Sequence, residues 1–543
     1  MVFMDKKTKQ ALDFQYVLNK IEVLTPYGLL YKNRMRAYLI GEEEELKYQL
    51  DILASYIPYV KDLDIRRRFN DLLAHVKDLR NSLRRAREGF TLNEVELFEI
   101  KNFLFILDDL KDMFDENPIP KFKETTISPI EKLKKVLDPE DTKISTFYIY
   151  DQYSEELKTI RKGKARIKKE IRQEINRIRE KVENELEIKL RPDNSIMIPK
   201  NKKDEIKRLQ ESPDMKYVSE TYMMVKFAIK ATDELTSLER RQLIFENKEA
   251  KEEERIKVML SKEVAKRHRE LYRNMVSIGR LDLFLAKAKF ALDINGSKPL
   301  IYDHHHIRIE DGRHPKVEEF LEERDLEFKP ISVNLQAGLA TITGANMGGK
   351  TISLKLIGLL TAMAQYGLYV PAKEMSLGLS KYIKTSIGDM QSTDSGLSTF
   401  GGEVKVVKEA IARADEKGLI LIDELARGTN PQEGYAISKA LVIHLLDKPS
   451  ITLLTTHYDN VANIENVVHL QVVGLSNLDF DKLEEEIKNS DGMDIINKHM
   501  DYSLKLVEKS KEIPRDALNI ARIMGLDDQI LKIAEDIIDN ERM

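Results

Sequence analysis

The sequence contains no cysteine, which excludes disulfide bonds, thiolate catalysis and zinc sites built from cysteine. It also has no uninterrupted apolar run close to the length of about 18 residues that a membrane-spanning helix needs. The first ten residues, MVFMDKKTKQ, lack the apolar stretch of a secretion signal. These absences favour a cytoplasmic protein that does not enter a membrane.

An excess of charge of one sign is lacking as well, because the formal net charge is −4 over 543 residues. The molecule as a whole therefore has no electrostatic bias toward nucleic acid, and any basic surface has to be local. Charged residues make up 33% of the chain and hydrophobic residues 42%, which is typical of a globular protein with long exposed helices. The length exceeds what one hydrophobic core supports and predicts about two to four domains.

Glycine is scarce before residue 290, where apolar residues recur at helical spacing along two stripes. Between the stripes, residues 191–203 contain proline and asparagine that break a helix, and residues 195–198 are compatible with a short strand. We expect two long helices that form a lever with a small tip, while a plain coiled-coil hairpin fits the periodicity equally well. The stripes are Ile167, Ile171, Ile175, Ile178, Val182 and Leu186, and then Ile256, Met259, Leu260, Val264, Leu271 and Met275.

The pattern changes after about residue 330, where short apolar runs alternate with amphipathic helical stretches. The runs are residues 339–343, 419–422 and 451–455. Apolar strands that alternate with helices predict a mainly parallel sheet that is buried on both faces. The tail, residues 511–543, is again predicted to be helical, with Pro514 near a helix start.

A phosphate-binding loop is predicted at residues 344–351, GANMGGKT, which match the pattern G-x4-G-K-[ST]. The loop follows a predicted strand and precedes a helical stretch, and this context counts against a chance match. Its glycines let backbone N–H groups surround phosphate oxygens, and the helix adds its positive N-terminal end. We expect Lys350 to reach the β- and γ-phosphates and Thr351 to ligate Mg²⁺.

Two acidic residues follow the second apolar run. Asp423 is predicted to hold the metal and Glu424 to orient or deprotonate the attacking water, because hydrolysis needs both roles. The third run ends just before His457, and the carboxyl end of a strand in such a sheet faces the ligand. His457 is therefore a candidate sensor of the γ-phosphate, with a structural histidine as the alternative.

Two further segments have weaker signals. Residues 385–403 and 426–430 are rich in small and polar side chains, and they form either anion-binding loops or surface turns. The run His304, His305 and His306 follows Asp303 and suggests a metal site, but adjacent residues do not face one metal without strain. We favour a histidine-rich turn.

Taken together, these motifs resemble the MutS family of DNA-mismatch and recombination ATPases. Five segments are similar to signatures of that family and occur in the same order. The stretches ITGANMGGKTISLKLIGLLTAMAQ and IGDMQSTDSGLSTF look closer to the recombination-suppressor branch than to the mismatch sensor. Residues 281–292, 311–315 and 514–526 resemble the end of the lever domain, the entry to the ATPase domain and the C-terminal dimerisation element. The five segments are GANMGGKT (344–351), YGLYVPA (366–372), LSTF (397–400), IDELARGT (422–429) and TTHY (455–458).

The resemblance implies an α + α/β fold class in three parts. A helical core and lever domain is expected at residues 1–295, with a small clamp-like tip near 190–235. A P-loop ATPase domain of the ABC type, with a mainly parallel sheet, is expected at 296–480. A C-terminal helical dimerisation element is expected at 481–543.

The resemblance also implies a composite site in a homodimer, with each nucleotide between two subunits and with ATP and Mg²⁺ as ligands. Phe328 stands where the family stacks an aromatic ring on adenine, and core packing is the alternative. The nucleotide-binding residues implied are Phe328, Gly344, Ala345, Asn346, Met347, Gly348, Gly349, Lys350, Thr351 and Gln391. The catalytic residues implied are Lys350, Glu424 and His457, and the Mg²⁺ ligands are Thr351 and Asp423. The partner's phosphate cap and the residues that signal between subunits are Ser398, Thr399, Phe400, Arg427, Gly428 and Thr429.

The sequence departs from the long members of the family at both ends. It starts at what resembles the helical core, and the tripeptide at residues 114–116, Phe-Asp-Glu, is best read as a chance match to the mismatch-reading wedge. It stops before the nuclease-like domain of the recombination-suppressor branch. We therefore expect a short form without direct mismatch reading or DNA cleavage.

A local basic stretch bears on the partner. Residues 158–181 contain eleven Lys or Arg residues and three Glu residues, a net charge of +8, and Lys164, Arg166, Lys168 and Lys169 are the candidate DNA contacts. A solvated face that acidic runs elsewhere neutralise is the alternative. The leading hypothesis is a dimeric clamp that hydrolyses ATP to change its grip on duplex or branched DNA. The alternative is an ATP-driven remodeller of a protein client, such as a reactivase of a cobalamin-dependent aminomutase.

Overall fold

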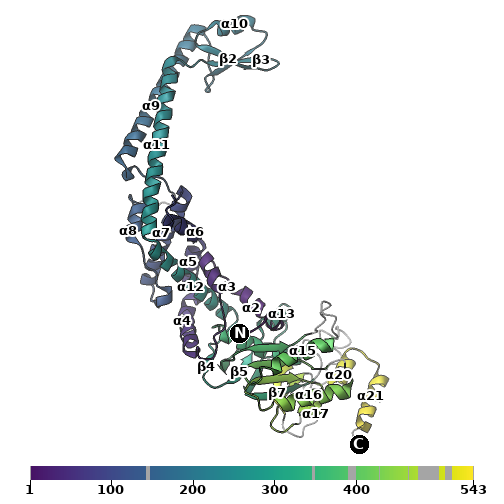
Figure 1. Cartoon of the computed structure of the whole chain (residues 1–543). Coiled ribbons are helices and arrows are strands. Elements are labelled where there is room, and N and C mark those ends of the chain that lie inside the picture. The colour runs from purple at the N-terminus through teal and green to yellow at the C-terminus, as the bar shows by residue number, and fades with distance from the viewer. Residues whose placement is uncertain are drawn as a thin grey trace. The chain divides into compact units, whose positions relative to one another are not determined.

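The computed structural model describes residues 2–141, 147–344, 349–388, 399–426, 429–462, 464–474, 501–507 and 516–541 (Figure 1). The chain divides into two compact units. Unit 1 comprises Met1–His75, Met113–Thr126 and Val276–Met543, and unit 2 comprises Val76–Asp112 and Ile127–Met275. Two helices, α7 (Glu94–Glu116) and α12 (His268–Asp293), run from one unit into the other.

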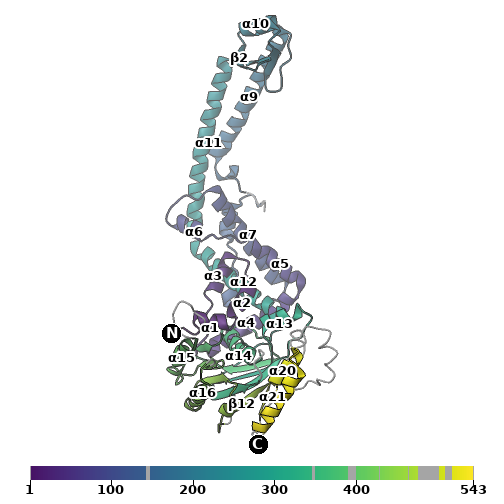
Figure 2. The ribbon, with the colours of Figure 1, turned by 90° about the vertical axis from the view of Figure 1, so that its right-hand side faces the viewer.

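Two long helices dominate unit 2. Helices α9 (Glu155–Leu186) and α11 (Asp233–Lys266) lie side by side in both views (Figures 1 and 2). They end in a folded module, so the predicted lever and tip replaces the plain hairpin. The module consists of β1 (Ser195–Pro199), α10 (Lys203–Glu211), β2 (Met215–Glu220) and β3 (Met224–Ile229), with antiparallel strands in the order β1-β3-β2. The shorter elements of unit 2 are α6 (Arg80–Arg87), α8 (Glu131–Leu137) and the 3₁₀ helix η2 (Asp151–Tyr153).

The predicted apolar stripes explain much of this packing. Ser154 and Thr232 cap the N-termini of α9 and α11, each accepting a hydrogen bond from a backbone N–H three residues on. The first stripe faces inward: Ile167, Ile178 and Val182 are buried. The second stripe is not one continuous face, because α11 ends at Lys266, α12 begins at His268, and Met259 is 43% exposed.

Unit 1 is built on a six-stranded sheet in the order β13-β12-β7-β11-β10-β9. All neighbours pair in parallel except β12 and β13, which confirms the predicted mainly parallel sheet. Every residue of β7, β10 and β11 is buried, as their continuous apolar sequences predict. The strands are β7 (Gly338–Thr343), β9 (Ile383–Ser386), β10 (Leu419–Ile422), β11 (Ile451–Thr455), β12 (Val468–Gly474) and β13 (Asp501–Leu506).

A second sheet in unit 1 has the order β4-β8-β5-β6, in which β5 pairs antiparallel with both neighbours. Its strands are β4 (Leu300–Tyr302), β5 (His306–Gly312), β6 (Ile331–Gln336) and β8 (Glu374–Gly378). The helices between the strands of unit 1 are α13 (Pro315–Glu322), α14 (Gly349–Gln365), α15 (Thr399–Ile411), α16 (Pro431–Leu445) and α17 (Asp459–Ala462), and α20 (Asp516–Ile523) and α21 (Asp528–Glu541) follow.

The N-terminal residues of the chain belong to this unit and pack against it. Its first helices are α1 (Lys6–Ala11), α2 (Phe14–Lys20), α3 (Pro26–Asn33), α4 (Glu43–Lys61) and α5 (Leu63–Ala74), with the 3₁₀ helix η1 (Lys123–Thr125) after α7. The rings of Phe14 and Tyr366 lie 4.6 Å apart. A Cβ at Gly358 of α14 would lie 2.6 Å from both Leu12 and Leu421. Helix α14 is therefore held tightly between the N-terminal segment and strand β10.

In the part of the chain that the structure describes, no helix is both long and apolar enough to cross a bilayer.

Candidate active site

The carboxyl ends of three neighbouring strands bring the predicted phosphate and acidic motifs together. Strand β11 lies between β7 and β10, and the parallel register sets Ile342 beside Thr455 and Leu454 beside Ile422. The segments that follow these strands therefore meet at one edge of the sheet, where such folds bind ligands.

Lys350 is the first residue that this edge places. It lies in the first turn of α14 and is only 3% exposed. Its Nζ donates to the carbonyl oxygen of Gly344, 2.9 Å away, and lies 2.8 Å from Oε1 of Glu424. The predicted phosphate-binding lysine and the predicted water-orienting carboxylate are thus in direct contact.

The two predicted Mg²⁺ ligands are also in contact. The hydroxyl of Thr351 donates to Oδ2 of Asp423, with the two oxygens 2.7 Å apart. The hydroxyl of Thr455 donates to Oδ1 of the same carboxylate at 2.6 Å. Hydroxyl and carboxylate oxygens are the ligands that Mg²⁺ prefers, so the donor set fits that ion.

Thr455 is a site residue that the sequence motifs did not single out. Its hydroxyl also accepts a hydrogen bond from the backbone N–H of Glu424, over 2.9 Å. One buried hydroxyl therefore holds the side chain of Asp423 and the backbone of Glu424. The only sequence signal was its place at the end of an apolar strand, just before TH.

The backbone after the acidic pair adopts an unusual conformation. Glu424 has φ = 39° and Ala426 has φ = 66°, the left-handed region that non-glycine residues seldom occupy. Such residues cost about 1–3 kcal/mol each and persist only where the surroundings hold them. The N–H of Ala426 donates to Oε2 of Glu403 in α15 over 3.3 Å. A contact from α15 therefore helps to hold this loop.

Other predicted residues lie in different surroundings. His457 is exposed beyond the end of β11, with its ring 4.0 Å from the ring of Tyr458, so it is not a core histidine. Phe328 is 4% exposed and stacks on Tyr502, with ring centroids 5.6 Å apart and planes 13° from parallel. Phe400 packs half-buried against the apolar core beneath α15 and α16. The hydroxyl of Thr429 donates to the carbonyl oxygen of Ala426 at 2.9 Å.

Several predictions fall outside the described residues and remain predictions. The side chain of Thr399 is likewise not described. The residues concerned are Ala345, Asn346, Met347, Gly348, Gln391, Ser398, Arg427 and Gly428.

The basic stretch of α9 divides into paired and exposed cations. Lys164 lies 2.6 Å from Glu249 of α11, and this carboxylate raises the pKa of the lysine. Arg166 pairs with Glu170 of its own helix but stays 82% exposed, and Lys168 and Lys169 are exposed.

Two further cations of α9 were missed among the candidate DNA contacts. Lys162 and Arg172 are exposed, and Lys162 stands four and seven residues before Arg166 and Lys169. This spacing puts the three side chains on one face of the helix, opposite the buried isoleucines. The helical period alone could have revealed that face.

The histidine run forms a packed turn. The ring of His305 contacts the Ser380 hydroxyl at 3.1 Å and the Pro449 carbonyl at 3.2 Å, and burial lowers the pKa of His305 to about 4. His306 contacts the Ser376 hydroxyl at 3.1 Å and the His304 carbonyl at 3.1 Å. Since both rings use both nitrogens, neither has a lone pair to offer a metal.

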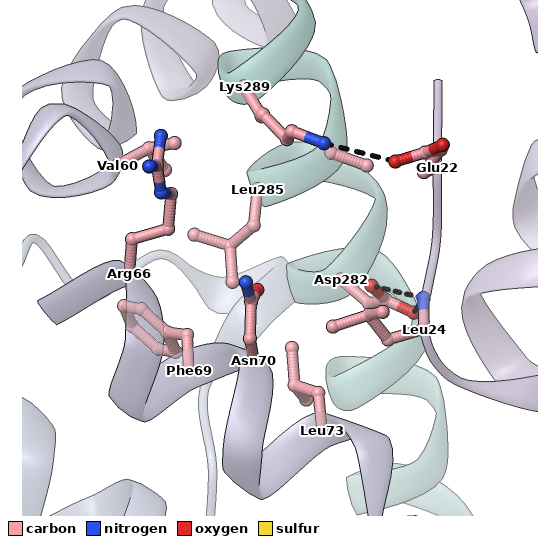
Figure 3. A pocket seen from close by; sticks show the side chains of 11 residues that line it. Glu22, Leu24, Val60, Arg66, Phe69, Asn70, Leu73, Asp282, Leu285 and Lys289 are labelled. Carbon is pink, nitrogen blue, oxygen red and sulfur yellow. Dashed lines mark hydrogen bonds and ion pairs between the residues drawn. The ribbon is translucent and has the colours of Figure 1, made fainter. Parts of the chain in front are cut away.

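A small cavity of about 140 Å³ lies between α5 and α12 in unit 1 (Figure 3). The buried carboxylate of Asp282 accepts hydrogen bonds from the N–H groups of Leu24 and Thr25, and burial raises its pKa. Lys289 pairs with Glu22 at 3.0 Å. These groups are satisfied within the protein, so we assign the cavity no ligand.

Comparison with known proteins agrees with this geometry. The family model of MutS domain V matches residues 340–540. The protein described as endonuclease MutS2 from Caldanaerobacter subterraneus subsp. tengcongensis is 27% identical over 99% of this chain and 65% of its own length. The MutS2 of Halothermothrix orenii is 29% identical over 71% and 49%, and that of Finegoldia magna is 28% identical over 99% and 66%. The chain thus spans between about half and two thirds of the length of these relatives.

The chain belongs to the MutS family, as the ordered motifs predict. Its relatives place it on the MutS2 branch of that family, which is the recombination-suppressor branch that the sequence around the phosphate loop indicated.

Proposed function

We propose that this chain is an ATPase that hydrolyses ATP at sites shared by two copies and uses the cycle to change its grip on duplex or branched DNA. One observation carries the proposal: Lys350, Thr351, Asp423 and Glu424 converge at one edge of the sheet through contacts of 2.7–2.8 Å. As functional parts we propose a lever and core at 1–295, an ATPase domain at 296–480 and a dimerisation element at 481–543.

Each residue of the cluster has a role that follows from its place. Lys350 binds the β- and γ-phosphates, since its ammonium is buried at the start of α14 next to the loop backbone. Thr351 and Asp423 hold Mg²⁺, which neutralises phosphate charge when it is bound with the nucleotide. Glu424 orients the attacking water and accepts its proton, and His457 contacts the γ-phosphate from the end of β11.

The base of the nucleotide has a candidate site at Phe328. Its ring lies parallel to that of Tyr502, which comes from β13 at the other edge of the sequence motifs. Two parallel aromatic rings suit a flat purine, which stacks on either face of such a ring. We infer that Phe328 and Tyr502 together contact adenine.

Two apolar surfaces of unit 1 support a homodimer. Helix α21 exposes Ile530, Ile533 and Ile537 by 52%, 59% and 53%, while Leu531 on its other face is 2% exposed. An open apolar groove of about 410 Å³ lies between α15 and α16. Exposed apolar stripes and grooves of this kind mark protein interfaces. In the dimer, the Ser398–Phe400 loop of one copy caps the phosphates held by the other, and Arg427, Gly428 and Thr429 connect the two sites.

DNA is the partner that the exposed cations of α9 support. Lys162, Arg166 and Lys169 lie on one face, and such a row binds backbone phosphates with release of counterions. If no DNA form binds at moderate salt, the proposal turns to the protein client, because the ATPase chemistry is the same for both.

The test of the ATPase site uses two variants and a control. We expect Glu424→Gln to bind ATP but to hydrolyse it at least about 100-fold more slowly, since it loses a general base. Lys350→Ala should lose nucleotide binding, as measured with a fluorescent ATP analogue. Glu416→Gln is the control, because its partner Arg413 lies 3.1 Å away and outside the cluster.

The same variants test the shared site. Glu424→Gln with ATP should sediment as a dimer in analytical ultracentrifugation. Normal hydrolysis by a chain that stays monomeric at every concentration would contradict the composite site, and normal turnover by Glu424→Gln would remove that residue from its role.

A further inference from the structure

The N-terminal segment makes a specific contact with the edge strand β9. The N–H of Ile383 donates to the carbonyl oxygen of Phe3 over 2.9 Å. Phe3 is 8% exposed and Met4 2% exposed, so the contact is packed and dry. Asp5 caps the next helix, accepting from the N–H of Thr8 at 2.7 Å. The segment is therefore fixed both to the sheet edge and internally.

Lys384 of β9 connects this segment to helix α15. Its Nζ lies 2.8 Å from Oδ2 of Asp5 and 2.8 Å from Oε2 of Glu409. Burial alone would lower the pKa of Lys384, but the two carboxylates raise it above its ordinary value. The lysine is 21% exposed, so water screens this bridge less than a fully exposed pair.

Helix α15 links this bridge to the acidic loop. Glu409 and Glu403 lie six residues apart on α15, which corresponds to about 9 Å along a helix. Glu403 accepts the N–H of Ala426, two residues after Glu424, where the backbone has the left-handed φ of 66°. A helix transmits displacement along its axis, so the anchor at Glu409 and the contact at Glu403 move together.

We propose that Lys384 is a positioning residue that, through Asp5, Glu409 and α15, sets the backbone on which Glu424 stands. This inference rests on the proposed ATPase function. It assigns a role in hydrolysis to the first residues of the chain, which none of the sequence motifs includes. Lys384 itself touches neither Lys350 nor Asp423 in any described contact, so its effect is on geometry and not on nucleotide binding.

The experiment compares Lys384→Met, Lys384→Arg and the control Lys448→Met. Lys448 pairs with Asp415 at 2.8 Å in the same unit, without contacting α15. Displaced catalytic groups lose rate steeply, so we expect Lys384→Met to lower kcat about tenfold with KM for ATP changed less than about twofold. Lys384→Arg should restore most of kcat, and Lys448→Met should match the wild type. An unchanged kcat, or a parallel rise in KM with loss of folded protein, would overturn the assignment.

A second measurement does not depend on ATP turnover. Hydrogen–deuterium exchange of the protein alone should be faster in Lys384→Met at residues 399–411 and 424–426, and unchanged at β7 and β12. Asp5→Asn should give a smaller change in the same peptides. If the wild type does not hydrolyse ATP, the proposed function fails, while exchange still decides whether Lys384 holds this loop. Identical exchange in Lys384→Met and wild type would refute the positioning role.

Discussion

Replacing Thr455 with valine removes a single hydroxyl that serves both acidic residues of the candidate site. The side chain is fully buried, so valine keeps its shape while the hydrogen bonds to Asp423 and from Glu424 are lost. A hydrogen bond to a charged group is worth about 1.5–3 kcal/mol, and one to a neutral group about 0.5–1.5 kcal/mol. We therefore expect Thr455→Val to cost about 2–4 kcal/mol of local stability.

The effect on hydrolysis follows from the same two bonds. Asp423 would lose one of the hydroxyls that fix its carboxylate, and the backbone of Glu424 would lose its acceptor. If 1.4–2.8 kcal/mol of that loss falls on the transition state, kcat drops by about 10–100-fold. Because Asp423 is the proposed Mg²⁺ ligand, the Mg²⁺ concentration for half-maximal turnover should rise as well.

The assay measures ATP turnover against Mg²⁺ concentration, together with the midpoint of thermal unfolding. Thr452→Val is the matched control: it lies in the same strand, is equally buried, and its hydroxyl has only a 3.5 Å contact with Ser450. Thr455→Val should have the lower kcat and the lower midpoint of the two. Equal kcat and equal Mg²⁺ dependence in both variants would show that the hydroxyl of Thr455 does not organise the site.

Three further outcomes are expected. Phe328→Ala should raise KM for ATP several-fold with kcat preserved, because stacking binds ground state and transition state alike; a lower kcat at unchanged KM would argue for core packing instead. The triple variant Lys162→Glu, Arg166→Glu and Lys169→Glu should weaken binding to duplex and junction DNA and reduce the slope of log affinity against log salt by about 3, whereas Lys164→Glu, which breaks a pair with Glu249, should affect folding more than the slope. Burial lowers the pKa of Lys287 to about 8, so the unfolded chain binds more protons at this residue between pH 8 and 10.5, and the stability of the wild type relative to Lys287→Met should rise over that range in urea unfolding. A flat difference would mean that the lysine is hydrated.

The sequence predicted the candidate site to the extent that the site follows from strand order. A parallel sheet aligns the carboxyl ends of its strands, so a motif after each apolar run has to lie at the same edge. That reasoning placed Lys350, Thr351, Asp423 and Glu424 together before any coordinates, and their contacts confirm the placement. The roles of these residues in hydrolysis remain predictions.

Contacts that depend on distant segments were beyond that reasoning. Tyr502 stacks on a residue 174 positions earlier, and Lys384 pairs with Asp5 across 379 positions. Neither aromatic nor charged residues carry a local signal for such partners, because many equivalent residues compete for each. The predicted stripe from Ile256 to Met275 was wrong in detail for a related reason: apolar spacing does not show that a helix ends at Lys266 and another begins at His268.

The basic helix shows how tertiary structure changes the meaning of a charge count. The +8 of residues 158–181 treats all cations alike, yet Arg161 contacts Asp151, Glu249 and Glu253, and Lys164 shares Glu249. Those cations neutralise α11 and add little to the field that a phosphate would meet. The charge available to DNA is the part on the face away from α11, including Lys162, Arg166 and Lys169. A variant that changes only that face therefore tests DNA binding without breaking the pairs that join α9 to α11.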